Sequence, residues 1–123
     1  MKKLLVFACL AWLCHPALAQ DRTFMSKADA EGLAKGKKWN HVRAGDGAKV
    51  QWDLQGNGQL FGMNQSSGSR DQGKWAINDA GQLCVTWQGR SQNRCVAVLK
   101  EGDKLKLVDS GDLKGAYADM TVE

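Results

Sequence analysis

The chain has 123 residues with 17 basic and 13 acidic side chains, a formal net charge of +4, and 43% hydrophobic residues. Removal of a predicted leader of 19 residues, which carries two lysines, leaves 104 residues and a charge of +2. That length is the usual size of one domain and excludes two separate cores, and the ordinary surface charge, without a nucleic-acid-binding motif, argues against a nucleic-acid partner.

Residues 1–19 have the pattern of a removable export signal. Two lysines precede an apolar run over residues 4–14, which is too short to span a bilayer. The small residues Ala17 and Ala19 suit a signal peptidase, so we expect the mature protein to begin at Gln20 and to work in the periplasm or outside the cell. Lipoprotein processing is disfavoured because a leucine precedes Cys14, so no stable membrane anchor is expected.

The first element predicted after the leader is a helix over residues 26–35. Ser26 and Asp29 resemble a capping box, and Gly36 supplies a stop. Its apolar neighbours could lay it across the end of a barrel as a plug: Phe24, Met25 and Leu33. The basic cluster that follows is interpreted as a solvated face, with binding of an anion as the alternative: Lys35, Lys37, Lys38 and Arg43.

Beyond the helix, apolar and polar residues alternate between turns rich in Gly, Asn and Asp. Val50, Trp52 and Leu54, for example, alternate with polar residues. Strands are expected at residues 39–43, 49–54, 59–64, 74–77, 83–87, 94–99, 104–107 and 116–122. The pattern predicts one all-β domain over residues 20–123, with about eight antiparallel strands in a small up-and-down barrel or, alternatively, a sandwich, and one short N-terminal helix.

The longest irregular segment covers residues 65–72 and is rich in Ser and Gly. We interpret it as a mobile loop that could be presented to a partner protein. The side chains proposed to contact that partner are Ser66, Ser67, Arg70 and Asp71.

Two of the four cysteines leave with the leader, so Cys84 and Cys95 are the remaining pair in an oxidising compartment and should form a disulfide. The flanking strand-like runs place them opposite each other in a hairpin. Its turn is either the two residues Gly89 and Arg90 or a four-residue loop over 88–91, which fits a disulfide better because it suits a closely spaced, non-hydrogen-bonded pair.

An aromatic set is the remaining candidate site. Trp52, Trp75 and Trp87 fall on the inward register of their strands, and Phe61 is placed with them less securely, as are Trp39 and Tyr117. Bulky side chains can fill a narrow barrel, and this core interpretation is preferred. The alternative is a cavity whose indole walls bind an apolar ligand.

Residues that could support catalysis or hold a metal are few. His41 is the histidine that remains after removal of the leader, and no nucleophile-elbow sequence accompanies it. One histidine and two paired cysteines are too few for zinc, and residues 53–58 fit a hairpin turn better than a calcium loop. The sequence therefore predicts neither an enzyme, a metal site nor a cofactor.

The run from Gly73-Lys74-Trp75 through Leu83-Cys84 and Trp87 to Cys95 resembles a family of short exported proteobacterial proteins of unknown function. The same Gly73-x-Trp75 element is similar to one in calycin barrels, which include lipocalins, avidins and secreted metalloprotease inhibitors. This resemblance implies a small barrel that binds either an apolar ligand or another protein.

Two functions follow from these observations. The first is a non-enzymatic protein-interaction module in the periplasm, such as an inhibitor of an envelope hydrolase or an accessory to another envelope protein. The alternative is a small barrel that binds an apolar ligand. An internal void beside the tryptophans would favour the ligand, and a filled interior would favour the protein partner.

Overall fold

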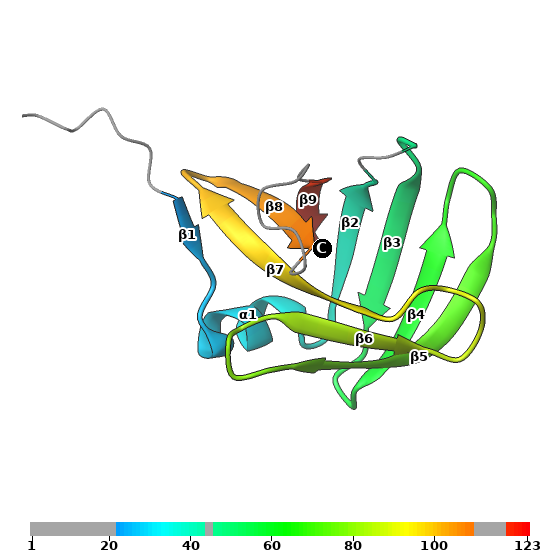
Figure 1. Ribbon diagram of the computed structural model, residues 1–123, viewed down its shortest axis with the longest axis horizontal. Coiled ribbons are helices and arrows are strands. Elements are labelled where there is room, and N and C mark those ends of the chain that lie inside the picture. The colour runs from blue at the N-terminus through cyan, green and yellow to red at the C-terminus, as the bar shows by residue number, and fades with distance from the viewer. Residues whose placement is uncertain (1–21, 44–45, 110–117) are drawn as a thin grey trace, which may run out of the picture.

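The computed structural model describes residues 22–43, 46–109 and 118–123 (Figure 1). The predicted leader at residues 1–19 and Tyr117 lie outside the described residues. The elements in chain order are β1 (Arg22–Phe24), α1 (Lys27–Ala34), β2 (Lys37–Val42), β3 (Lys49–Leu54), β4 (Gln59–Asn64), β5 (Arg70–Ile77), β6 (Leu83–Trp87), β7 (Arg94–Glu101), β8 (Lys104–Asp109) and β9 (Ala118–Val122).

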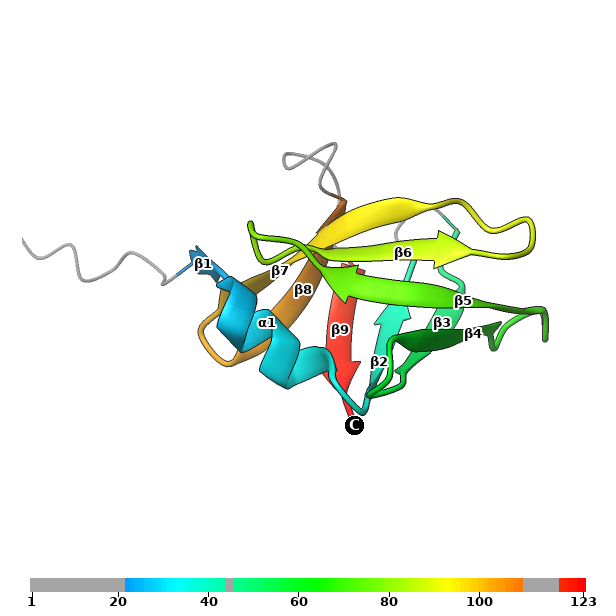
Figure 2. The ribbon, with the colours of Figure 1, turned by 90° about the horizontal axis from the view of Figure 1, so that it is seen from below.

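Strands β2 to β9 form a closed up-and-down barrel (Figures 1 and 2). Each strand pairs antiparallel with the next along the chain, and β9 closes the barrel on β2, where Met120 lies opposite His41. The short β1, which the sequence did not predict, extends the sheet beside β7, with Phe24 opposite Leu99. The predicted all-β fold with one short helix is therefore confirmed, as a barrel and not a sandwich.

The alternating pattern determines which side chains lie inside the barrel. In β3, Val50, Trp52 and Leu54 are buried, whereas the residues between them are exposed or partly exposed. Cross-strand partners face the same side, so Leu54 meets Leu60 of β4 inside the barrel. Side chains that are fully buried, or nearly so, form the core: Trp39, Leu54, Leu60, Leu83, Val85 and Val98.

Helix α1 lies across one end of this barrel (Figure 2). The side chain of Ser26 caps it by accepting a hydrogen bond from the backbone N–H of Asp29 at 3.2 Å, as the sequence predicted. Ala34 is buried, Leu33 packs against the core, and the indole N–H of Trp39 donates to the Leu33 carbonyl at 3.0 Å. The helix therefore plugs this end, although Phe24, expected to contribute, is 45% exposed.

Cys84 and Cys95 form the predicted disulfide between β6 and β7. They lie directly opposite each other with their Cα atoms 3.9 Å apart, which is the close spacing of a non-hydrogen-bonded pair. The connection is longer than either predicted turn, because β6 ends at Trp87 and β7 begins at Arg94. Residues 88–93 thus form a six-residue loop, which we call the mouth loop.

The glycine of the Gly73-x-Trp75 element has a steric role. A Cβ atom at Gly73 would collide with the backbone carbonyl oxygen of Thr86 and lie 2.9 Å from the Cα atom of Trp87. Since backbone atoms cannot move aside as a flexible side chain can, β5 and β6 approach each other in a way that only glycine permits.

Candidate ligand cavity

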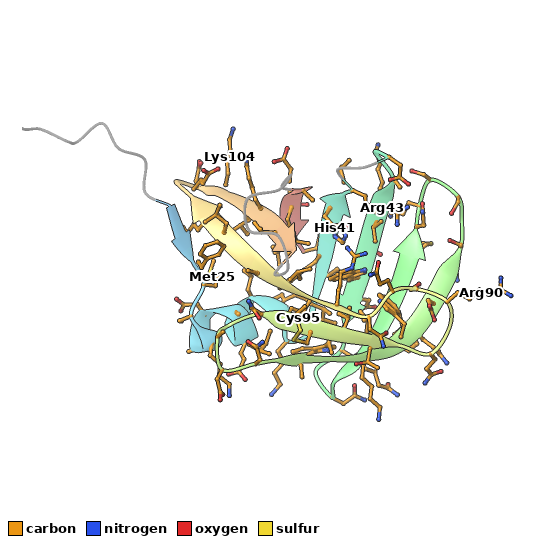
Figure 3. All side chains as sticks on the ribbon, in the orientation of Figure 1. Met25, His41, Arg43, Arg90, Cys95 and Lys104 are labelled. Carbon is orange, nitrogen blue, oxygen red and sulfur yellow. A yellow bond between two sulfur atoms is a disulfide. The ribbon has the colours of Figure 1, made fainter. Side chains whose placement is uncertain are left out.

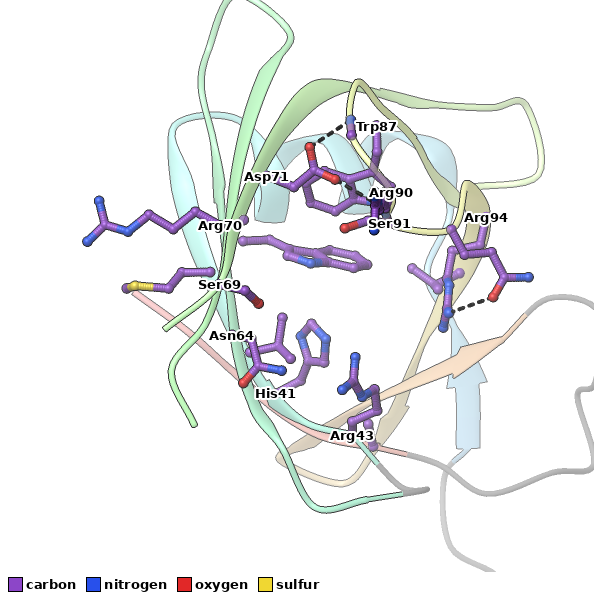
Figure 4. A pocket seen from close by; sticks show the side chains of 18 of the residues that line it. His41, Arg43, Asn64, Ser69, Arg70, Asp71, Trp87, Arg90, Ser91 and Arg94 are labelled. Atoms are coloured by element: carbon purple, nitrogen blue, oxygen red, sulfur yellow. Dashed lines mark hydrogen bonds between the residues drawn. The ribbon is translucent and has the colours of Figure 1, made fainter. Parts of the chain in front are cut away.

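The barrel end opposite α1 is hollow. A cavity of about 780 Å³ opens there, lined by inward-facing side chains from the end of β2, the start of β3, the end of β4, the starts of β5 and β7, and the end of β6 (Figure 4). Residues of the mouth loop line its rim. Trp52 belongs to the buried core and Trp87 packs against it, as the preferred interpretation expected, but both also border this cavity, so the interior is not completely filled.

Three aromatic rings form one wall of the cavity. The rings of His41 and Trp52 meet edge to face with centroids 4.8 Å apart, and those of Trp52 and Trp87 do so at 6.1 Å. All three residues lie on the inward register. His41 is two residues from the inward-facing Trp39 on β2. Trp87 pairs with Gly73, which in turn pairs with the inward-facing Leu60, so Trp87 faces the interior as well. The sequence placed Trp52 and Trp87 here and missed His41.

Gly62 makes room for the Trp87 ring. A Cβ atom at Gly62 would collide with the far edge of that indole and lie 2.9 Å from its Cζ3 atom. Gly62 is also the cross-strand partner of Trp52. The absence of a side chain at this inward position lets Trp87 lie against the β4 backbone, and this leaves the space in front of the ring open as cavity.

His41 is a neutral imidazole at physiological pH. Burial, followed by the positive charges of Arg94 and Arg43, lowers its pKa from 6.5 to about 4. Its Nδ1 atom is buried and makes no hydrogen bond with the described part of the protein. A buried polar atom without a partner is uncommon, and at a cavity wall a ligand is a natural partner for it.

Arg43 lies close to His41 (Figures 3 and 4), whereas Arg94 lies across the cavity on the side of β7 (Figure 4). The Nε and Nη2 atoms of Arg43 bond both carboxylate oxygens of Asp46, at 3.0 and 2.8 Å. This pair lowers the pKa of Asp46 to about 2. Arg94 at the start of β7 donates from Nη2 to the side chain of Gln92 at 3.3 Å. Both arginines therefore place positive charge near His41, and Asp46 offsets part of that of Arg43.

Asp71 holds the mouth loop in place. Its carboxylate accepts hydrogen bonds from the backbone N–H groups of Gly89 at 2.9 Å and Ser91 at 3.1 Å (Figure 4). Hydrogen bonds from Ser91 and from the backbone N–H of Gln72 lower the pKa of this carboxyl. Asp71 therefore binds the mouth loop, and the hydrogen-bond donors around its carboxylate already compensate its charge.

The other predicted aromatic residues lie away from the cavity. The indole N–H of Trp75 donates to the Gln55 carbonyl at 2.9 Å, and its ring packs against the core toward the closed end. Phe61 is 44% exposed on the outer face of β4. Its assignment to the interior is wrong because Leu60 and Gly62 occupy the inward register of that strand.

The predicted partner loop is shorter than the sequence suggested, because β5 already begins at Arg70. Ser66 and Ser67 are exposed in a turn that the Asn64 side chain organises by accepting both of their backbone N–H groups, at 3.0 and 3.1 Å. Arg70 is also exposed, and its side chain extends away from the cavity (Figure 4). Of the four predicted residues, Arg70 and Asp71 line the cavity, and the carboxylate of Asp71 is the side-chain group that binds the mouth loop at its rim.

His41, Arg43 and Arg94 are the cavity residues that sequence reasoning missed as a group. The alternation that identified the apolar interior also places Arg94 on the same face as Val96 and Val98, and His41 on the same face as Trp39. The sequence signal that could have identified these residues is a charged or polar side chain at a position where the inward-facing alternation of a strand continues.

Comparison with known protein families, characterised proteins and solved structures finds no match for the chain. The family resemblances of the sequence therefore stay predictions. Within the described ranges, no group of three or more His, Cys, Asp or Glu side chains could hold a metal ion. No helix in that part of the chain is long and apolar enough to cross a membrane.

Proposed function

We propose that this protein binds a small organic molecule in its open-ended cavity and releases it unchanged. The observation that carries the proposal is the cavity itself, about 780 Å³ with Trp52 and Trp87 in its wall. Cavities of roughly 300 to 1,000 Å³ lined by aromatic residues with a few polar groups are typical of small-molecule sites.

The cavity favours ligand binding over the protein-interaction module that the sequence alone preferred. A module that acts through its surface has no need of a hollow interior, and a void reduces packing and stability. In the described part of the chain, the large exposed apolar side chains lie on three strands that are not adjacent in the sheet: Phe24, Val42 and Phe61.

Binding without a chemical step agrees with the surroundings of His41. Its ring contacts Trp52, and the charged groups that lower its pKa are arginines. A catalytic histidine of the triad type instead contacts a nucleophile and an orienting carboxylate. The Cys84–Cys95 disulfide supports the further proposal that the protein works after export, in the periplasm or outside the cell.

Intrinsic fluorescence tests the proposed function. The protein, with the leader removed, is titrated with a library of small aromatic and aliphatic compounds, and hits are verified by calorimetry. We expect saturable quenching by some compounds, reduced in Trp87→Phe, whose ring lines the cavity, and retained in Trp75→Phe, whose ring does not. If no compound in the library quenches the fluorescence, or if quenching is the same in the two variants, ligand binding in this cavity is contradicted.

A further inference from the structure

We propose that the ligand is an uncharged molecule with a flat aromatic body and one carbonyl oxygen, and that Asn64 donates a hydrogen bond to this oxygen while the body lies against Trp52 and Trp87. This inference rests on the proposed function and specifies the chemistry of its ligand. Three features of the cavity support it, namely the change from apolar to polar side chains along its wall, the donor group of Asn64 and the compensation of its charged groups.

The inner wall of the barrel becomes more polar toward the mouth. Along β4, the inward positions are Leu60, then Gly62, then Asn64 at the open end. Trp52 of β3 lies opposite Gly62, between the apolar and the polar position. A ligand that matches this order has an apolar body inside the barrel and one polar group at the mouth.

Asn64 presents a hydrogen-bond donor at that polar position. Its side-chain oxygen accepts the backbone N–H groups of Ser66 and Ser67, which fixes the orientation of the amide. The Nδ2 atom of the same amide makes no hydrogen bond with another described residue, and Asn64 lines the cavity (Figure 4). Asn64 and His41 flank Val50 on the inner face. The group that complements an amide N–H is an accepting oxygen.

An anion does not fit because the arginines at the cavity already have partners. Arg43 binds both carboxylate oxygens of Asp46. Arg94 lies across the cavity from Arg43 and donates to Gln92 (Figure 4). An anionic ligand would have to share a guanidinium that is already bonded, and a charge that leaves water without a full partner is costly.

A cation does not fit for a different reason. The positive charges of Arg94 and Arg43 add to the effect of burial in lowering the pKa of His41, so a second cation beside this ring would be repelled. The carboxylate of Asp71 is engaged by the amides of the mouth loop. An uncharged ligand meets neither of these costs.

The aromatic wall defines the body of the ligand. The rings of Trp52 and Trp87 meet edge to face with centroids 6.1 Å apart, and Val96 and Leu107 add aliphatic surface to the same cavity. Aromatic rings prefer offset-stacked or edge-to-face neighbours. A flat aromatic body is therefore the complement to this wall.

Four probes of one shape test the inference: 2-acetylnaphthalene, 2-isopropenylnaphthalene, 2-naphthoate and the 2-naphthamidinium ion. They share the naphthalene body and differ in the end group, which is a ketone, an alkene, an anion or a cation. Calorimetry with the protein, leader removed, measures the four affinities. The ketone should bind at least about tenfold more tightly than either ion, because each ion loses its hydration without gaining a full partner.

Asn64→Asp removes the donor and keeps the acceptor. Its carboxylate can still accept the Ser66 and Ser67 amides, whereas Nδ2 is replaced by an oxygen that repels the ketone. The ratio of ketone affinity to alkene affinity should fall about tenfold, and alkene binding should change little. Asn57→Asp is the matched control and should leave the ratio unchanged, because Asn57 likewise accepts a backbone N–H, that of Gln59, in the turn between β3 and β4.

The side-chain amide of Asn64 provides a second readout that does not depend on affinity. Its two protons give a pair of NMR resonances, which are assigned by their loss in Asn64→Asp, and the remaining spectrum reports whether that variant is folded. Saturation with 2-acetylnaphthalene should shift the pair downfield through the new hydrogen bond, whereas 2-isopropenylnaphthalene should not.

The outcomes separate the two proposals. An unchanged ratio of ketone to alkene affinity in Asn64→Asp, or tighter binding of either ion than of the ketone, overturns the uncharged carbonyl ligand and leaves ligand binding in the cavity intact. Lack of binding by all four probes also overturns the inference, and the proposed function falls with it only when no compound of the wider library binds.

Discussion

The two ends of the barrel use the same strands and differ in what fills them. Toward α1, the inward positions carry large apolar side chains such as Leu54, Leu60 and Leu83, all fully buried. Toward the mouth loop, the lining residues include His41 of β2 and Asp71 of β5, and a cavity of about 780 Å³ is left. The comparison teaches that the stability of the fold is concentrated at the closed end, which lets the open end hold polar groups and empty space.

The largest expected difference is between two tryptophans, one at each end. Trp39 is fully buried and its indole N–H bonds the Leu33 carbonyl of α1, whereas Trp87 borders the cavity. We expect Trp39→Ala to lower the free energy of unfolding by about 3 to 5 kcal/mol, and Trp87→Ala by about 1 to 2 kcal/mol, because one side of its ring already lacks protein contacts.

Urea unfolding of the two variants measures both changes, and the barrel should remain cooperative in Trp87→Ala. Equal losses would mean that the open end contributes as much to folding as the closed end, and would remove the basis of the comparison.

Acid should weaken the open end through His41. Its pKa is about 4 in the folded barrel against 6.5 in the unfolded chain, so between these values the unfolded chain binds more protons. The contribution of the neutral imidazole is complete above pH 6.5 and is lost as the pH falls to 4, an expected change of about 3 kcal/mol.

His41→Phe keeps an aromatic ring at the wall and removes the titration. The variant should therefore show a flatter dependence of the urea midpoint on pH between 6.5 and 4 than the unaltered protein. An identical slope in both proteins would show that another group, and not His41, makes the open end sensitive to acid.

The disulfide should stabilise the fold by a somewhat smaller amount. It links residues separated by 11 positions on β6 and β7, the two strands that the mouth loop connects. Loss of the bridge in the double variant Cys84→Ala, Cys95→Ala should cost roughly 2 to 3 kcal/mol by loop-closure entropy and leave a cooperative fold.

Comparison of the double variant with the unaltered protein by urea unfolding and by hydrogen exchange sharpens this expectation. Exchange should rise most in β6, β7 and the mouth loop and least in the strands beside α1. A uniform rise over the whole barrel, or loss of cooperative unfolding, would show that the closed end depends on the bridge too.

The closed end was largely predictable from the sequence. Alternation in runs such as Val50 to Leu54 has a single physical cause, burial of one face, and it located eight of the nine strands and both termini of β4 and β6. The Ser26 cap was predictable because it depends on residues close together in the sequence. The pairing of Cys84 with Cys95 was predictable because these two cysteines remain after the predicted leader. Strand β1 was missed because three residues are too few to show a period.

The open end was not predictable in the same way. Phe61 is apolar yet faces solvent, and Arg94 is charged yet continues the inward register. The residue type at either position therefore predicts the wrong side of the sheet. Whether Trp87 fills the interior or borders a void depends on Gly62 across the sheet, a contact between residues 25 positions apart. Register, and not residue type, decides both points.

The smallest expected effect concerns the mouth loop. Asp71→Asn replaces a carboxylate that accepts the Gly89 and Ser91 amides with a neutral group that also carries two donors, so these bonds should weaken. Because the carboxyl is exposed, the urea midpoint should hardly change, whereas hydrogen exchange at these two amides should rise. Asp79→Asn is the control, since Asp79 pairs only with exposed Lys27 in the described structure. Unchanged exchange in Asp71→Asn would show that contacts other than this carboxylate hold the rim of the cavity, and a large fall in the urea midpoint would show that the rim belongs to the folding core after all.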